Sequence, residues 1–205
     1  MHTRLFLVRH GESEGNLRGR VQGQSESPLT DRGRAQARAA GRALRNRGIR
    51  HVYSSDLERA RESAELIDES LGLGFAQDPR LREMCFGQLE GLGWSELDVY
   101  YAEAEARGEG DWYTHRPPGG ESRAELTERV VDTLSDLVDR HRGETLLLVS
   151  HGGFIGFLLR RVLGLPGTPR YVGFRTPNGA IHRFDHRDER FHLVTWAEQV
   201  HLDGL

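Results

Sequence analysis

The stretch Leu5-Phe6-Leu7-Val8-Arg9-His10-Gly11-Glu12 decides the fold of this chain. Its first four residues are apolar, and a short continuous apolar run is typical of a strand that is buried on both faces. Strands of this kind form open α/β sheets, in which ligands bind beyond the carboxyl ends of the strands. Because Arg9 and His10 come at that end, the stretch predicts a ligand site at the carboxyl edge of a sheet.

A second copy of this arrangement comes late in the chain. The apolar run Thr145-Leu146-Leu147-Leu148-Val149 leads directly into Ser150-His151-Gly152-Gly153. Two histidines at strand ends, each followed by glycine, indicate one active site built from both halves of the chain.

Strand and helix signals alternate elsewhere, which predicts the α/β fold class with a mainly parallel sheet covered on both faces. We expect helices at about 30–47, 57–71, 122–138 and 153–163, and strands at 51–54, 144–150, 179–184 and 191–196. The last two strands should pair as an antiparallel edge. Residues 1–205 should form one domain, in which the irregular segment at about 88–118 makes a helical cap over the carboxyl edge.

Composition excludes several classes of protein. At 205 residues and 37% hydrophobic content the chain can bury one sizeable core, and its net charge of −3 argues against sequence-independent nucleic-acid binding. All 28 basic residues are arginine, most simply through compositional bias, which rules out lysine chemistry. With one cysteine, a polar start and no long apolar stretch, we expect a cytoplasmic protein that does not enter membranes.

His10 is the candidate nucleophile. A neutral imidazole can accept a phosphoryl group, and covalent catalysis divides one difficult displacement into two easier ones. Phosphoryl transfer also requires positive charge around the equatorial oxygens, for which the planar guanidinium groups of Arg9 and Arg59 are suited. Arg59 falls in the first turn of a helix expected to be capped by Ser55, where free N–H groups also favour an anion. The alternative for Arg59 is an ion pair with Glu58 or Glu62 on the same helix.

His151 and Glu83 complete the candidate set. His151 could be a zinc ligand, a second base or a donor to the phosphoryl group; no metal-binding spacing accompanies it, so the donor role is favoured. A leaving alkoxide must be protonated, and Glu83 is the best candidate acid because its apolar neighbours would partly desolvate it. A surface ion pair with Arg80 or Arg82 is the alternative for Glu83.

Several motifs occur together in one order along the chain. They are Arg9-His10-Gly11-Glu12-Ser13, Asn16, Ser54-Ser55-Asp56-Leu57 with Arg59-Ala60, Glu83, Pro118-Gly119-Gly120-Glu121-Ser122 and Ser150-His151-Gly152. In this set the chain resembles the histidine phosphatase superfamily, also called phosphoglycerate-mutase-like, from residue 5 to about residue 184. The resemblance implies a three-layer α/β/α sandwich with a mostly parallel mixed sheet and one antiparallel strand.

The resemblance also implies roles for individual residues. His10 would become phosphorylated, Arg9, Arg59 and His151 would form the phosphate pocket, and Glu83 would serve as acid and then as base. Substrate binding would involve Asn16, Gln22, Gly23 and Gly152. No metal or organic cofactor is implied, and the partner would be a small phosphomonoester; whether the chain forms a homodimer is left open.

Within the superfamily the chain resembles the phosphatases more than the mutases. Residues 83–91, Glu-Met-Cys-Phe-Gly-Gln-Leu-Glu-Gly, look like the phosphatase pattern E-x-x-F-G-x-x-E-G, whereas mutases usually have Glu-Arg-His-Tyr-Gly followed by cationic contacts for a carboxylate. The alternatives are a cofactor-dependent phosphoglycerate mutase and a module that binds phosphorylated ligands without catalysis. A binding module would have no use for a nucleophile and an acid together, so the sequence favours hydrolysis.

Overall fold

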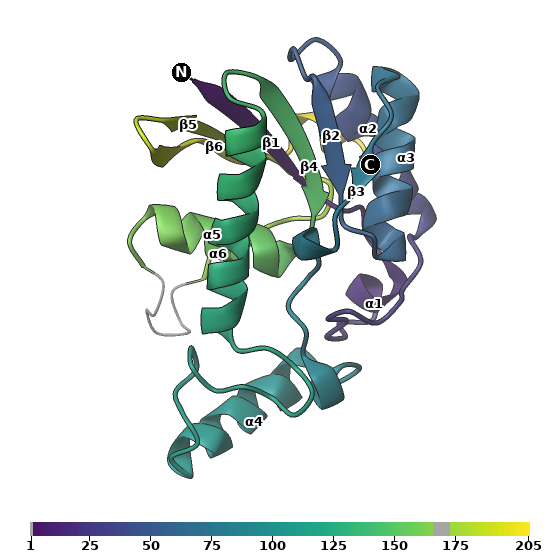
Figure 1. The fold of residues 1–205 in the computed structure, drawn as a ribbon. Helices are drawn as coiled ribbons and strands as arrows, with labels where there is room; N and C mark the ends of the chain where they lie inside the picture. Colours follow the sequence, from purple (N-terminus) through teal and green to yellow (C-terminus); the bar gives the residue numbers. More distant parts are fainter. Residues whose placement is uncertain (1, 166–172) are drawn as a thin grey trace.

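A computed structural model describes residues 2–165 and 173–205, which form a six-stranded mixed sheet with helices on both faces (Figure 1). The strand order is β3-β2-β4-β1-β5-β6, with β1 at Thr3–Arg9, β2 at His51–Ser54, β3 at Ala76–Gln77, β4 at Thr145–Ser150, β5 at Ile181–Arg187 and β6 at Arg190–Glu198. Strand β5 is antiparallel to both its neighbours, and the other neighbouring pairs are parallel. The predicted α/β/α sandwich with a mostly parallel mixed sheet is therefore confirmed.

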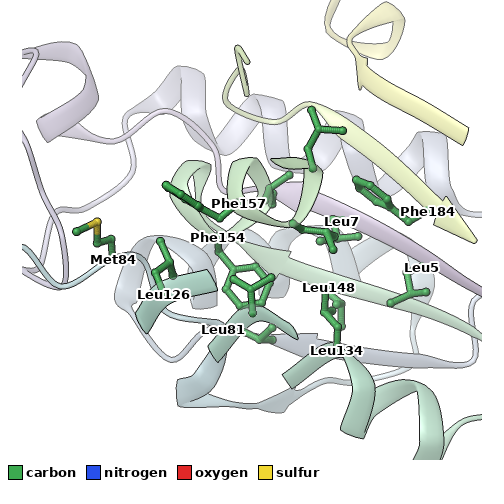
Figure 2. Close-up of a cluster of buried hydrophobic side chains, with 14 of the residues drawn as sticks. Leu5, Leu7, Leu81, Met84, Leu126, Leu134, Leu148, Phe154, Phe157 and Phe184 are labelled. Atoms are coloured by element: carbon green, nitrogen blue, oxygen red, sulfur yellow. The ribbon is translucent and has the colours of Figure 1, made fainter. Parts of the chain in front are cut away.

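The two faces of β1 bury alternate residues, as the period of a strand requires. Leu5 and Leu7 belong to a cluster with residues of α5 (Arg123–Arg140) and α6 (Gly152–Val162), part of which Figure 2 shows. Phe6 and Val8 belong to a second cluster, formed with α2 (Asp31–Leu44) and α3 (Glu58–Leu71). Each fully buried aliphatic side chain stabilises the fold by about 1.5–3 kcal/mol. The sheet is thus held between two apolar layers.

The carboxyl ends of the parallel strands point toward a region bordered by short elements and by one outlying helix. Helix α4 (Trp94–Ala106) lies beyond these strand ends, away from the sheet (Figure 1). The other short elements are α1 (Glu14–Leu17), η1 (Pro79–Leu81), η2 (Gly87–Leu89) and η3 (Val200–Leu202). A Cβ on Gly87 would stand 2.2 Å from the Pro118 carbonyl oxygen, so only glycine permits this close approach of the two segments that flank α4.

Some local predictions differ from the structure. The cap predicted at Ser55 is wrong: α3 has Leu57 as its N-cap residue and no side-chain cap. The Ser55 hydroxyl instead accepts a hydrogen bond from the Leu57 N–H, two residues along (3.3 Å). The hairpin between β5 and β6 turns at Asp188 and Glu189 alone, and both residues have a positive φ. A two-residue turn of this kind matches the twist of the two strands.

None of the helices in the described part of the chain combines the length and the apolar character needed to cross a membrane.

Candidate active site

A small cavity of about 160 Å³ lies at the carboxyl edge of the sheet. The predicted site residues that line it are Arg9, His10, Asn16, Gln22, Gly23, Arg59, Glu83 and Gly152. His151 adjoins the cavity through its ring, whose centroid is 5.1 Å from that of His10. The structure therefore brings the predicted residues to one place, and it adds Phe86, Trp94, Gly153 and Thr176 to the lining.

His10 is held so that one ring nitrogen is available for chemistry. Its Nδ1 lies 2.7 Å from the Gly11 carbonyl oxygen, which can only accept, so Nδ1 carries the proton and Nε2 carries a lone pair. Burial lowers the pKa of His10 well below its usual value, and the charges of Arg59 and Arg9 lower it further. The ring is thus a neutral imidazole with a free Nε2.

His151 has the same tautomer as His10. The Ser55 hydroxyl is fully buried and lies 2.9 Å from His151 Nε2, the acceptor available to its O–H, so Nδ1 of His151 carries the proton. That buried Nδ1 has no hydrogen-bond partner among the described residues. Burial lowers the pKa of His151 well below its usual value, with further lowering from Arg59 and His10. His151 is therefore a neutral donor beside His10.

Arg59, which is buried, and Arg9, which is partly buried, bring two positive charges to the cavity. Arg59 donates to the carbonyl oxygens of Gly23 (2.7 Å) and Ser25 (2.9 Å), so the predicted alternative of an ion pair within its helix does not occur. Arg9 donates to the Thr176 carbonyl oxygen, and burial lowers its pKa to about 10. The Nε atoms of both arginines are buried without a hydrogen-bond partner among the described residues. Cations with buried, unused donors are a suitable environment for an anion.

Two amide side chains are oriented by residues around them. Asn178 donates from Nδ2 to Oδ1 of Asn16 (2.9 Å), and Ser13 donates to Oε1 of Gln22 (2.7 Å). Because the amide oxygens are engaged, the NH₂ groups of Asn16 and Gln22 are the ends left to serve a ligand in the cavity. Asn178 also donates to the His10 carbonyl oxygen (3.1 Å), which ties the residue bearing the nucleophile to the amide.

Glu83 is fixed by the start of α6. Its Oε2 accepts from the Gly153 N–H (2.9 Å), and its Oε1 accepts from the Met84 N–H (2.8 Å). The ion pair predicted as its alternative does not form: Arg82 pairs with Asp56 and Arg80 with Asp78. The half-buried carboxylate thus lies at the first turn of a helix whose dipole also favours an anion.

The backbone that carries Glu83 is clamped by Arg129 on α5. Arg129 donates to the carbonyl oxygens of Arg80 (2.8 Å), Arg82 (2.9 Å) and Glu83 (3.2 Å), and it pairs with Glu121. Glu121 in turn accepts from the Cys85 N–H (2.9 Å). These hydrogen bonds fix the backbone on either side of Glu83 and so fix the position of Glu83 relative to the sheet.

Sequence reasoning missed several of these supporting residues. Ser55 was interpreted as a helix cap, whereas it orients His151. Asn178 and Arg129 lie in no pattern that predicts a role, because their partners come from distant parts of the chain. No sequence pattern predicted a role for Trp94 in the site, apart from its position in the irregular segment at about 88–118.

One group in the described part of the chain could share a metal ion: His51, His141 and Glu144. It lies where β2 and β4 begin, at the edge of the sheet opposite the cavity. Neither His10, His151 nor Glu83 belongs to such a group among the described residues. The residues around the cavity are instead suited to bind a phosphate-sized anion between arginines and to attack it with an imidazole.

Comparison with known proteins agrees with this arrangement. Residues 5–199 match the family model of the histidine phosphatase superfamily (branch 1), so the chain belongs to that superfamily and its class is a histidine phosphatase. It is 37% identical over 211 residues to the probable phosphoglycerate mutase GpmB of Salmonella paratyphi B, with 98% of this chain and 95% of the relative covered.

Two solved structures are close to the fold of this chain. A phosphoserine phosphatase of Entamoeba histolytica in complex with phosphoserine has a TM-score of 0.84 at 29% identity, covering 98% of this chain and 99% of that one. A putative alpha-ribazole-5'-P phosphatase of Escherichia coli has a TM-score of 0.81 at 30% identity, covering 96% and 97%.

Proposed function

We propose that this chain hydrolyses phosphomonoesters of small metabolites through a phosphohistidine formed at His10. The observation that carries the proposal is the state of His10: its ring is neutral, its Nδ1–H is bonded to the Gly11 carbonyl oxygen, and it lines one cavity with Arg9 and Arg59, whose charges act on it. A lone pair held next to anion-binding groups is what attack on phosphorus requires.

In the first step His10 Nε2 attacks the phosphorus and the bond to the ester oxygen breaks. Arg9, Arg59 and the Nδ1–H of His151 stabilise the charge on the equatorial oxygens, and the amide groups of Asn16 and Gln22 orient them. Glu83 gives its proton to the departing oxygen, so that an alcohol rather than an alkoxide leaves.

In the second step water replaces the alcohol. The Glu83 carboxylate takes a proton from the water as its oxygen attacks phosphorus, and the bond from phosphorus to Nε2 breaks. Inorganic phosphate leaves, His10 returns to its neutral form and Glu83 is again an acid. The proton that Glu83 releases in the first step is thus replaced in the second step by a proton from water.

Three arginines in or beside the segment at about 88–118 already have partners, which supports hydrolysis over transfer of the phosphoryl group back to a substrate. A mutase must hold a glycerate carboxylate until it takes the phosphoryl group back, which requires free cationic contacts. Arg107 is paired with Glu109, and Arg116 with Glu125. Arg123 is covered by aromatic rings and donates to the Trp112 carbonyl oxygen (2.8 Å).

The name of the GpmB relative favours phosphoglycerate mutase as the second candidate. Incubation with 3-phosphoglycerate and a trace of 2,3-bisphosphoglycerate separates the two. We expect inorganic phosphate to form faster than 2-phosphoglycerate; the reverse would establish the mutase.

The test of the nucleophile uses His10→Ala. We expect wild type, but not this variant, to release phosphate from p-nitrophenyl phosphate, and wild type to carry label from substrate as a phosphoramidate that is lost in acid and stable in base. A chain that binds phosphate with no turnover in wild type would be a binding module. Label that survives acid and is lost in base would exclude His10 as the acceptor.

A further inference from the structure

A second, larger cavity adjoins the phosphate cavity and takes no part in the steps above. We call it the cap chamber; its volume is about 510 Å³. Its lining is Glu83, Met84, Phe86, Trp94, Leu97, Asp98, Trp112, Arg123, Leu126, Gly153 and Phe157. Since Glu83, Phe86, Trp94 and Gly153 also line the phosphate cavity, the two spaces meet along these residues.

The position of Glu83 decides which space the leaving group enters. If Glu83 protonates the departing oxygen, that oxygen lies beside its carboxyl group, and the carbon skeleton continues into a space that Glu83 borders. The cap chamber is bordered by Glu83, whereas the polar groove of about 1,100 Å³, which shares Arg9 and Trp94 with the phosphate cavity, is not. With Glu83 as the acid, the leaving group would therefore enter the cap chamber.

The inner wall of the cap chamber is apolar. Met84, Leu97, Leu126 and Phe157 are all buried, with at most 8% of any of them exposed. In Figure 2, Met84, Leu126 and Phe157 lie at one end of the buried cluster. This wall offers a ligand contact area and no hydrogen-bond partner from these four side chains.

The charged groups of the cap chamber do not suit an anionic leaving group. Asp98 is the acidic residue of the chamber besides the proposed acid Glu83, and the guanidinium of Arg123 lies over the rings of Tyr101 (4.0 Å) and Trp112 (4.4 Å). Burial lowers the pKa of Arg123, which reflects how little water reaches it. A carboxylate on the leaving group would meet the like charge of Asp98 and one cation already engaged by aromatic rings.

Trp94 covers the place where the cavities meet. It is the first residue of α4, its side chain is 55% exposed, and it lines the phosphate cavity, the cap chamber and the polar groove. An indole exposed at the mouth of an apolar chamber gains most when a flat or apolar group packs against it.

We propose that the preferred substrates are phosphomonoesters of bulky apolar or aromatic alcohols, whose leaving group fills the cap chamber and packs against Trp94. The inference rests on the proposed function and narrows it to a substrate class. Polyol, sugar and glycerate phosphates are the disfavoured class, because their hydroxyl and carboxylate groups would lose water without gaining partners on the apolar wall.

The test compares kcat/KM for 2-phenylethyl phosphate with that for ethyl phosphate, two esters of unactivated primary alcohols. The additional ring buries enough apolar area in the chamber for an increase of at least about tenfold. Glucose 6-phosphate and 3-phosphoglycerate should be no better than ethyl phosphate. A polar ester preferred over 2-phenylethyl phosphate would overturn the inference and leave the proposed function standing.

Trp94→Ala and a control on the same helix test the contact directly. We expect Trp94→Ala to lower the ratio of kcat/KM for 2-phenylethyl over ethyl phosphate by about threefold or more, because part of the ring's packing surface is removed. Val99→Ala should leave the ratio unchanged, since Val99 is 57% exposed and lines none of these cavities. A ratio that Trp94→Ala does not lower would overturn the inference, while failure of every ester to form phosphohistidine would overturn the proposed function as well.

Discussion

The substitution Gly153→Ala should displace the carboxyl group of Glu83 without changing its chemistry. A Cβ at Gly153 would stand 2.1 Å from Glu83 Oε1 and 3.0 Å from its Cδ, whereas ordinary contacts begin at 3.4 Å. The carboxylate must therefore move by more than 1 Å, and its hydrogen bond from the Gly153 N–H is weakened. Because misplacement of this size costs about a hundredfold in rate, kcat/KM for an alkyl phosphate should fall by about that factor.

Gly156→Ala is the matched control. Gly156 lies on the same helix, and a Cβ there would meet no atom within 4 Å. Both substitutions gain up to about 1 kcal/mol of helix propensity, so thermal unfolding should show neither variant to be grossly destabilised. Phosphate release from an alkyl phosphate is the assay. If Gly153→Ala were as active as Gly156→Ala, Glu83 would not be the acid held by α6.

Three further outcomes follow from the same site. Glu83→Gln should slow turnover of alkyl phosphates more than that of p-nitrophenyl phosphate, whose leaving group needs little protonation; equal losses of kcat/KM would point to another acid. Activity should be unaffected by EDTA and inhibited by vanadate, since arginines supply the charge and vanadate can adopt the five-coordinate geometry; restoration of lost activity by a divalent ion would contradict this. Burial lowers the pKa of His182 to about 4, and the pKa values of His10 and His151 are also lowered. The folded chain therefore keeps these rings neutral, whereas the unfolded chain protonates them below about pH 6.5. The stability that these neutral rings contribute is thus fully present above that pH and falls toward pH 5, by about 2 kcal/mol from His182 alone. An equal free energy of unfolding in urea at about pH 7.5 and pH 5 would refute the argument.

Much of the fold could be predicted because its signals are local. The apolar run of β1 and that of β4 predict buried strands, and a parallel pair of such strands places their ends together. His10 and His151 thereby became candidates for one site before any contact was known. The helix α3 was predicted from its apolar stripe, but its cap was not, because Ser55 binds a histidine 96 positions along the chain.

What the sequence by itself determined is the sheet, its covering helices and the residue types gathered at its carboxyl edge, since strand and helix periods depend on neighbouring residues. The tertiary structure alone decided how those residues are oriented. The tautomer of His151, the amide orientation set by Asn178 and the hold of Arg129 on the segment of Glu83 all depend on hydrogen bonds between distant parts of the chain. Such bonds follow no period along the sequence, because they form wherever folding brings a donor and an acceptor within about 3 Å of one another.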